Sequence, residues 1–176
     1  MNKPREIPEQ LYLNRELGQL AFNRRVLAQA ENRATPLLER LRFLCIVSSN
    51  LDEFFEIRVS GLQAEIEAGS PAVGPDRMDA QLVFRQVAKE AHELVALQYR
   101  LLNEEILPGL AAEGVRFLRR DDFAPAQAEW IKAYFFREVM PVLTPIGLDP
   151  AHPFPKVLNK SLNLVVELEG RDAFGR

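Results

Sequence analysis

Residues 35–67 read TPLLERLRFLCIVSSNLDEFFEIRVSGLQAEIE, and this stretch decides the fold. Thr35 is a suitable N-cap, and Pro36 suits the first helical turn because proline lacks only an amide hydrogen that would be unpaired there. Apolar residues then recur every three or four positions as far as Leu62, which predicts one helix to Glu67, about 45 Å long. Its predicted inward face consists of Leu37, Leu41, Leu44, Ser48, Leu51, Phe55, Arg58 and Leu62.

The same spacing predicts a helix on either side of this stretch. The first runs from Leu13 to about Asn32 with Asn14 as its cap, and the third runs from an Asp76 cap to Leu107, where Pro108-Gly109 ends it. A loop, GSPAVGP, joins the second and third helices. The predicted inward residues are Leu17, Leu20, Ala21, Val26, Leu27 and Ala30 in the first helix, and Leu82, Val83, Val87, Ala91, Leu94, Leu101 and Leu102 in the third. Residues 1–109 are therefore predicted to form an antiparallel bundle of three helices.

The pattern changes in residues 110–176. Residues 115–118 (VRFL) have the composition of a short strand, a helix around Trp130 follows, and five prolines between 141 and 155 then impose an extended path. Apolar and polar residues alternate from Leu162 to Leu168, as in a half-buried strand. Such a strand needs partners, and only residues 170–176 remain after it. We therefore expect a mainly α protein whose second part is the truncated start of an α+β domain.

Composition excludes several classes of partner and location. The 176 residues carry 22 basic and 25 acidic side chains, well mixed, with a net charge of −3. No broad cationic face is expected, so we predict no nucleic-acid partner. The N-terminus has no signal-peptide pattern, and no window of about 18 uncharged apolar residues occurs, so we expect a cytoplasmic protein without a transmembrane segment. Membrane association of a longer parent protein stays open.

Residues that could carry catalysis are few. The sequence has no glycine-rich phosphate loop, no GxSxG motif and no pair of cysteines or histidines at metal-ligand spacing. Cys45, inside FLCIV, is expected to be a small buried hydrophobic residue. His92 is expected on a helix surface, whereas His152, in the proline-braced DPAHPFP, is the stronger candidate for a functional role. We therefore predict no catalytic and no metal-binding residue in this chain.

The polar triplet Ser48-Ser49-Asn50 inside an apolar helix needs an explanation, because short polar side chains compete for backbone hydrogen bonds. In one interpretation the small residues let the first helix pack closely, or Asn50 caps a restarted helix in a capping box with Glu53. In the other, Asn50 presents a donor and an acceptor to a cleft, where a carboxamide can pair with a nucleobase edge. Periodicity alone favours the first interpretation.

Three blocks of the chain resemble the polyphosphate kinase family, which moves a terminal phosphate between ATP and inorganic polyphosphate. They are LYLNRELGQLAFNRRVLAQA, TPLLERLRFLCIVSSNLDEFFEIRVSGL and MPVLTPIGLDPAHPFPKVLNKSLNLVVEL, in that order from about Leu11 to Leu168. The pair of motifs SSNLDEFF and DPAHPFP is more specific than any lone glycine motif. One departure is visible, since the family usually has ELSW where this chain has Glu16-Leu17-Gly18-Gln19.

The resemblance implies the N-terminal part of a multidomain phosphotransferase. In that family the asparagine of SSNLDEF helps to bind ATP or ADP, which here is Asn50, and Arg58 is a weaker candidate for phosphate contact because an ion pair with Glu65 or another acid explains it equally well. The phosphate-accepting histidine and the Mg²⁺ ligands lie in C-terminal domains of the family, so this chain alone is expected to be inactive and to bind no Mg²⁺. Residues 110–176 resemble the start of the family's head domain. That domain supports dimerisation in the family, so the resemblance implies a homo-oligomer. The alternative is a non-catalytic helical interaction or dimerisation module.

Overall fold

The structure is a computed structural model that describes residues 11–69, 76, 78–148, 153–158, 160–167 and 169–170. The predicted mainly α fold is confirmed, because most of the described residues lie in helices. Two units, Met1–Arg119 and Arg120–Arg176, each make their own internal contacts.

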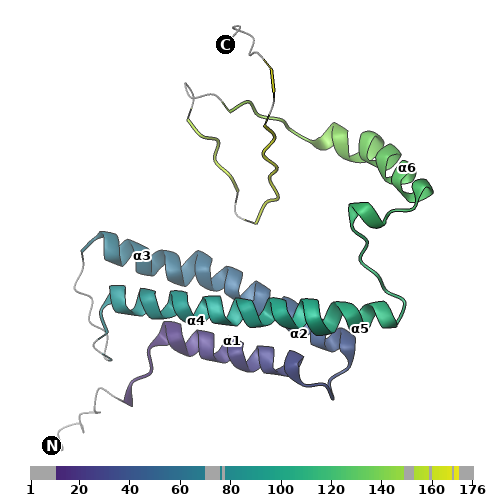
Figure 1. Ribbon diagram of the computed structural model, residues 1–176. Coiled ribbons are helices and arrows are strands. Elements are labelled where there is room, and N and C mark those ends of the chain that lie inside the picture. Colours follow the sequence, from purple (N-terminus) through teal and green to yellow (C-terminus); the bar gives the residue numbers. More distant parts are fainter. Residues whose placement is uncertain are drawn as a thin grey trace, which may run out of the picture. The chain divides into compact units, whose positions relative to one another are not determined.

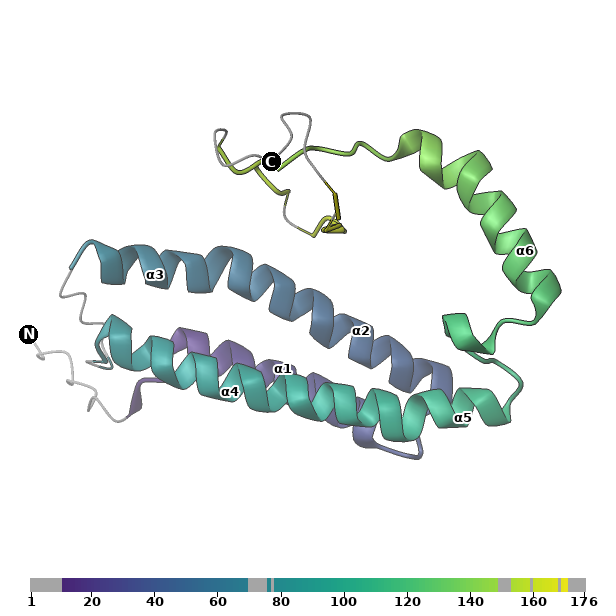
Figure 2. The ribbon, with the colours of Figure 1, turned by 45° about the horizontal axis from the view of Figure 1, so that its top comes forward.

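The first unit contains the three predicted helical runs. They are α1 (Arg15–Glu31), then α2 (Leu37–Glu53) continued by the π-helical segment η2 (Phe54–Val59) and α3 (Ser60–Glu67), and finally α4 (Ala80–Leu101) continued by η3 (Leu102–Ile106) and α5 (Leu107–Ala112). The second and third runs lie antiparallel, and α1 packs against both α2 and α4 (Figures 1 and 2). One shared apolar core lies between them.

The helix starts agree only partly with the sequence. Asn14 caps α1 as predicted, with Oδ1 accepting hydrogen bonds from the backbone N–H groups of Glu16 and Leu17. The predicted Asp76 cap of α4 is wrong, because Asp79 is the last extended residue and its Oδ1 accepts from Leu82 N–H at 2.7 Å. Asp76 instead accepts a hydrogen bond from Asn14 Nδ2 at 2.8 Å.

The π-helical segment η2 shifts the buried face of the second run by one residue. The core residues before it are spaced by three or four, but the step from Phe54 to Val59 is five, which matches the wider turn of a π-helix. Phe54 itself still follows Leu51 at the regular spacing and is fully buried, whereas Phe55 is 43% exposed and Ser48 is also exposed. The predicted burial of Phe55 and Ser48 is therefore wrong, because the buried face contains the residues immediately before them, Phe54 and Val47.

The third run also contains a π-helical segment, η3. Its buried residues step by five from Leu101 to Ile106, across η3. The helix continues past Pro108 to Ala112, so the predicted end at Pro108-Gly109 is wrong. A proline ring clashes with the carbonyl four residues earlier in a regular α-helix, and the π turn immediately before Pro108 moves that carbonyl away.

Gly114 supplies the actual end of the third run. Its φ of +83° lies in the left-handed region that favours glycine. The Val115 N–H donates to the Leu110 carbonyl at 2.8 Å, and the Gly114 N–H donates to the Ala111 carbonyl at 3.1 Å. This pair of bonds is the Schellman motif, which satisfies the last carbonyls of a helix.

A buried arginine links three helical segments at the end of the bundle where the chain passes from α1 to α2. Arg40 is only 7% exposed; its Nε donates to the Ala30 carbonyl and its Nη2 to Glu105 Oε2, both at 2.6 Å. The hydrogen bond from Arg40, together with nearby Arg33, holds the pKa of Glu105 below its usual value. This ion pair joins α2 to η3, and the hydrogen bond to the Ala30 carbonyl joins α2 to the last turn of α1.

The second unit contains η4 (Arg120–Asp122), α6 (Pro125–Tyr134), η5 (Phe135–Val139) and η6 (Met140–Val142). The predicted strands at 115–118 and 162–168 are not formed among the described residues, which exclude Leu168. Neither segment has a partner strand there, and an extended segment without one forms no ladder. None of the described side chains in this unit is buried.

Candidate functional site

Asn50 and Arg58 lie on the face of the second run that contacts α1. Asn50, in the last turn of α2, donates from Nδ2 to Oδ1 of Asn23 at 2.8 Å. Arg58, in η2, forms an ion pair through Nη2 with the Glu16 carboxylate. The two residues are eight positions apart on a continuous helix, which is about 12 Å along its axis. Both residues singled out in the sequence are therefore held by side chains of the first helix.

The Asn23–Asn50 pair has one partner inside the core and one at its edge. Asn23 is fully buried, whereas Asn50 is half-buried. Asn50 lies within a continuous α-helix, so its predicted role as the cap of a restarted helix is wrong. Ser48 and Ser49 are exposed, which means that they do not provide close packing against α1 either. The polar triplet thus divides into two solvent-facing hydroxyls and one carboxamide bound to α1.

Arg58 lines an acidic cavity of about 320 Å³ that is bounded by residues of α1, η2, α3 and α4. Glu16, Glu65 and Asp76 all line this cavity. The expectation of an ion pair with an acid is confirmed, and the partner is Glu16 rather than Glu65. A contact between Arg58 and phosphate oxygens stays a prediction, and three neighbouring carboxylates would oppose the approach of an anion.

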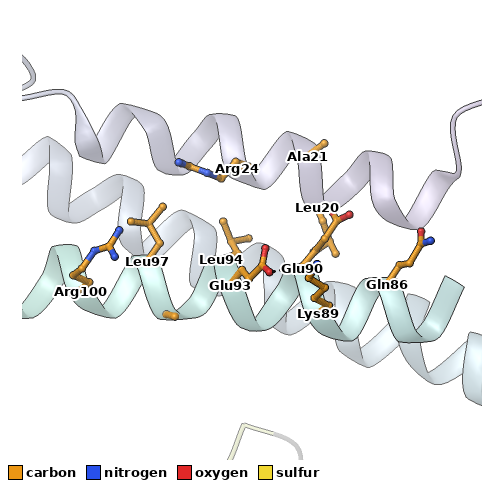
Figure 3. A pocket seen from close by; sticks show the side chains of 11 residues that line it. Leu20, Ala21, Arg24, Gln86, Lys89, Glu90, Glu93, Leu94, Leu97 and Arg100 are labelled. Carbon is orange, nitrogen blue, oxygen red and sulfur yellow. Dashed lines mark ion pairs between the residues drawn. The ribbon is translucent and has the colours of Figure 1, made fainter. Parts of the chain in front are cut away.

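A larger groove of about 970 Å³ lies between α1 and α4 (Figure 3). Arg24 extends from α1, and α4 contributes Arg100, Glu90 and the ion pair between Lys89 and Glu93, whose charged atoms are 3.9 Å apart. Leu20, Leu94 and Leu97 supply the apolar part of the lining. Both cations and carboxylates line this groove, so its charge selects no class of ligand.

The remaining candidates from the sequence carry little chemistry. Cys45 is exposed, contrary to the prediction, because the buried positions Leu44 and Val47 direct the residue between them outward. His92 lies on the exposed surface of α4, as expected, with Nδ1 2.6 Å from the Ala88 carbonyl oxygen. His152 lies outside the described residues.

The described part of the chain shows neither a cluster of metal ligands nor a membrane-spanning helix. No group of three or more His, Cys, Asp or Glu side chains there is arranged to hold a metal ion. Within the same residues, no helix combines the length and the apolar character needed to cross a bilayer.

Sequence reasoning missed Asn23, although a signal was present. The buried residues of α1 are Leu20, Asn23, Leu27 and Ala30, a regular spacing of three, four and three. Asn23 therefore occupies a core position by period, and its polarity alone excluded it from the predicted core. A polar residue at a core position of an amphipathic helix calls for a hydrogen-bond partner, and that partner is Asn50.

Comparisons with known proteins cover both units. A family model described as polyphosphate kinase N-terminal domain matches residues 12–118, and one described as polyphosphate kinase middle domain matches residues 126–176. The chain is 61% identical over 164 residues to a polyphosphate kinase of Burkholderia multivorans, and 60% identical to one of Paraburkholderia phytofirmans. These matches cover 93% of the chain but only 24% of each relative.

A solved structure gives the same result. The crystal structure of polyphosphate kinase from Porphyromonas gingivalis matches with a TM-score of 0.70 and 28% identity, over 84% of this chain and 21% of that protein. The chain thus spans about a quarter of the length of the relatives that it resembles. Because the N-terminal family model alone matches more than half of the residues, the chain belongs to the polyphosphate kinase family.

Proposed function

We propose that this chain is the N-terminal part of an enzyme that reversibly transfers the terminal phosphate of ATP to inorganic polyphosphate. The observation that carries this proposal is the match of residues 12–118 to the family's N-terminal domain, which includes the SSNLDEFF block. In this proposal the catalytic histidine and the Mg²⁺ ligands belong to other parts of the enzyme. The helical unit contributes to binding of the adenine nucleotide.

Asn50 is the residue proposed to contact the nucleotide. It is half-buried at the edge of the α1–α2 interface, and a carboxamide can donate and accept hydrogen bonds at a nucleobase edge. The adenine does not change during phosphoryl transfer, so such a contact stabilises the ground state and the transition state equally. Its loss should raise the Michaelis constant for ATP and leave turnover nearly unchanged.

The test is steady-state kinetics of polyphosphate synthesis by the full-length gene product. Asn50→Ala is expected to raise the Michaelis constant for ATP about two- to tenfold, the range for one lost hydrogen bond, with a smaller effect on kcat. Asn103→Ala, which alters an exposed asparagine on η3, serves as the matched control. An unchanged Michaelis constant in Asn50→Ala would refute the nucleotide contact.

The proposal also specifies partners and domain organisation. The substrates are ATP and polyphosphate, residues 1–109 form the nucleotide-covering domain, and residues 110–176 begin a head domain that supports a homo-oligomer. The proposed parent enzyme is cytoplasmic, and the chain has no nucleic-acid partner.

One observation favours a second function, a non-catalytic interaction module. The described part of residues 120–170 exposes large apolar side chains, among them Trp130, Phe136 and Phe154. Exposed apolar surface of this kind marks an interaction site when no further domain covers it. The two proposals differ in the mass of the native gene product, detected with an antibody raised against this chain. A product several times larger than 20.0 kDa favours the enzyme, and one near 20.0 kDa favours the module.

A further inference from the structure

We propose that Asn23 is a positioning residue that fixes the orientation of the Asn50 side chain for nucleotide binding. This inference rests on the proposed contact between Asn50 and the nucleotide. Asn23 itself is fully buried, so it acts through Asn50 and touches no ligand.

The geometry makes Asn23 the residue that decides which way the Asn50 amide faces. The two side chains come from α1 and α2, and Nδ2 of Asn50 donates to Oδ1 of Asn23 at 2.8 Å. A free asparagine side chain rotates about its last bond with a broad, roughly two-fold preference, so its oxygen and nitrogen could exchange places. With Nδ2 bound to Asn23, the Oδ1 of Asn50 is left to accept a hydrogen bond, which in this proposal comes from the amino group of adenine.

A purely structural role explains Asn23 poorly. Its Nδ2 is buried and has no hydrogen-bond partner among the described residues. A buried donor without a partner costs stability, and an apolar side chain of similar shape removes that cost. Asn50, which is only half-buried, can then turn its Nδ2 to water. Leucine has the same branching as asparagine and would fit the helical period of the core better. The amide at this position therefore costs stability and provides an oriented acceptor for Asn50.

Gln98 shows what an amide with a structural role looks like in the same bundle. It is 8% exposed, and its Nε2 donates to the Leu44 carbonyl at 2.9 Å, which joins α4 to α2. In the described part of the chain, neither polar atom of the Gln98 side chain is a buried atom without a hydrogen-bond partner. Gln98 therefore offers a matched control, because its replacement should affect stability and leave nucleotide binding unchanged.

The experiment compares two substitutions with opposite chemistry in the full-length gene product. Asn23→Leu removes the acceptor, and we expect the Michaelis constant for ATP to rise about two- to tenfold while the melting temperature stays the same or increases. Asn23→Asp keeps an acceptor for Asn50 Nδ2 but buries a carboxyl group, so we expect a lower melting temperature with a Michaelis constant near that of the wild type. Gln98→Met should lower the melting temperature alone.

A double substitution separates this inference from the proposed function. If Asn23 acts only through Asn50, then Asn23→Leu adds nothing to the Michaelis constant in an Asn50→Ala background. An effect of Asn50→Ala without any effect of Asn23→Leu refutes the positioning role and leaves the proposed function intact. A Michaelis constant that follows the melting temperature through both Asn23 variants refutes it as well, because that is the behaviour of a structural residue. If Asn50→Ala has no effect, the proposed function itself fails.

Discussion

The adjacent residues Phe54 and Phe55 provide a direct test of which face of the second run is buried. Phe54 is fully buried, and its replacement by alanine removes the whole ring and leaves a cavity, which costs about 3–5 kcal/mol of unfolding free energy. Phe55 is 43% exposed, so roughly half of the transfer free energy of a phenylalanine is at stake, about 1 kcal/mol, without a cavity. The inward face expected from the sequence contains Phe55 and would reverse this order.

The assay is urea unfolding followed by far-ultraviolet circular dichroism, which reports the helices. Domains of this size have about 5–15 kcal/mol of stability, so Phe54→Ala could leave the bundle only marginally folded. Phe54→Leu keeps most of the apolar volume and provides a milder variant, expected to lose about 1 kcal/mol. Equal losses of unfolding free energy in Phe54→Ala and Phe55→Ala, or a larger loss in Phe55→Ala, would refute the burial of Phe54 in place of Phe55.

Two further predictions concern charge and glycine positions. The hydrogen bond from Arg40 lowers the pKa of Glu105 in the folded state. Ionised Glu105 therefore stabilises the fold at pH values above the usual glutamate pKa of 4.5, and this contribution is lost as the pH falls through the folded-state pKa. The stability advantage of the wild type over Glu105→Gln, measured by urea unfolding, should therefore be constant near neutrality and shrink below pH 4.5; an advantage independent of pH would contradict this. A Cβ added at Gly18 meets nothing within 4 Å, so Gly18→Ala should raise the unfolding free energy by about 0.5–1 kcal/mol. The same change at Gly109 would bring Cβ to 3.1 Å from Leu37 Cδ2, so Gly109→Ala should be the less stable variant, and the reverse order would refute the close approach of α5 to α2.

The three helices could be predicted from the sequence because local signals specify them. Asn14 caps α1 through its own side chain, and apolar spacing marks the buried faces over several turns. The limits of these helices were less predictable. Pro108 signals a helix end, yet the π turn of η3 accommodates it, and the continuation to Gly114 depends on packing that no local pattern reveals.

The candidate site could be predicted only in part. The SSNLDEFF motif identified Asn50 through its resemblance to a family, but spacing alone favoured a packing or capping role for it. The contact with Asn23 joins residues 27 positions apart, so neither residue's partner can be read from its neighbours in the chain. The groove between α1 and α4 was not predicted for the same reason, because it exists only where two separate helices meet.

The sequence by itself determined the number of helices, their order and the family to which the chain belongs. Periodicity and capping depend on residues that are close together in the sequence, so they can be recognised without knowing how the rest of the chain packs. The tertiary structure alone decided that Phe54 rather than Phe55 enters the core, and that Asn23 binds Asn50. Both outcomes depend on how the helices fit against each other, since the choice of buried ring and a hydrogen bond between two helices are settled only when α1, α2 and α4 pack around one core.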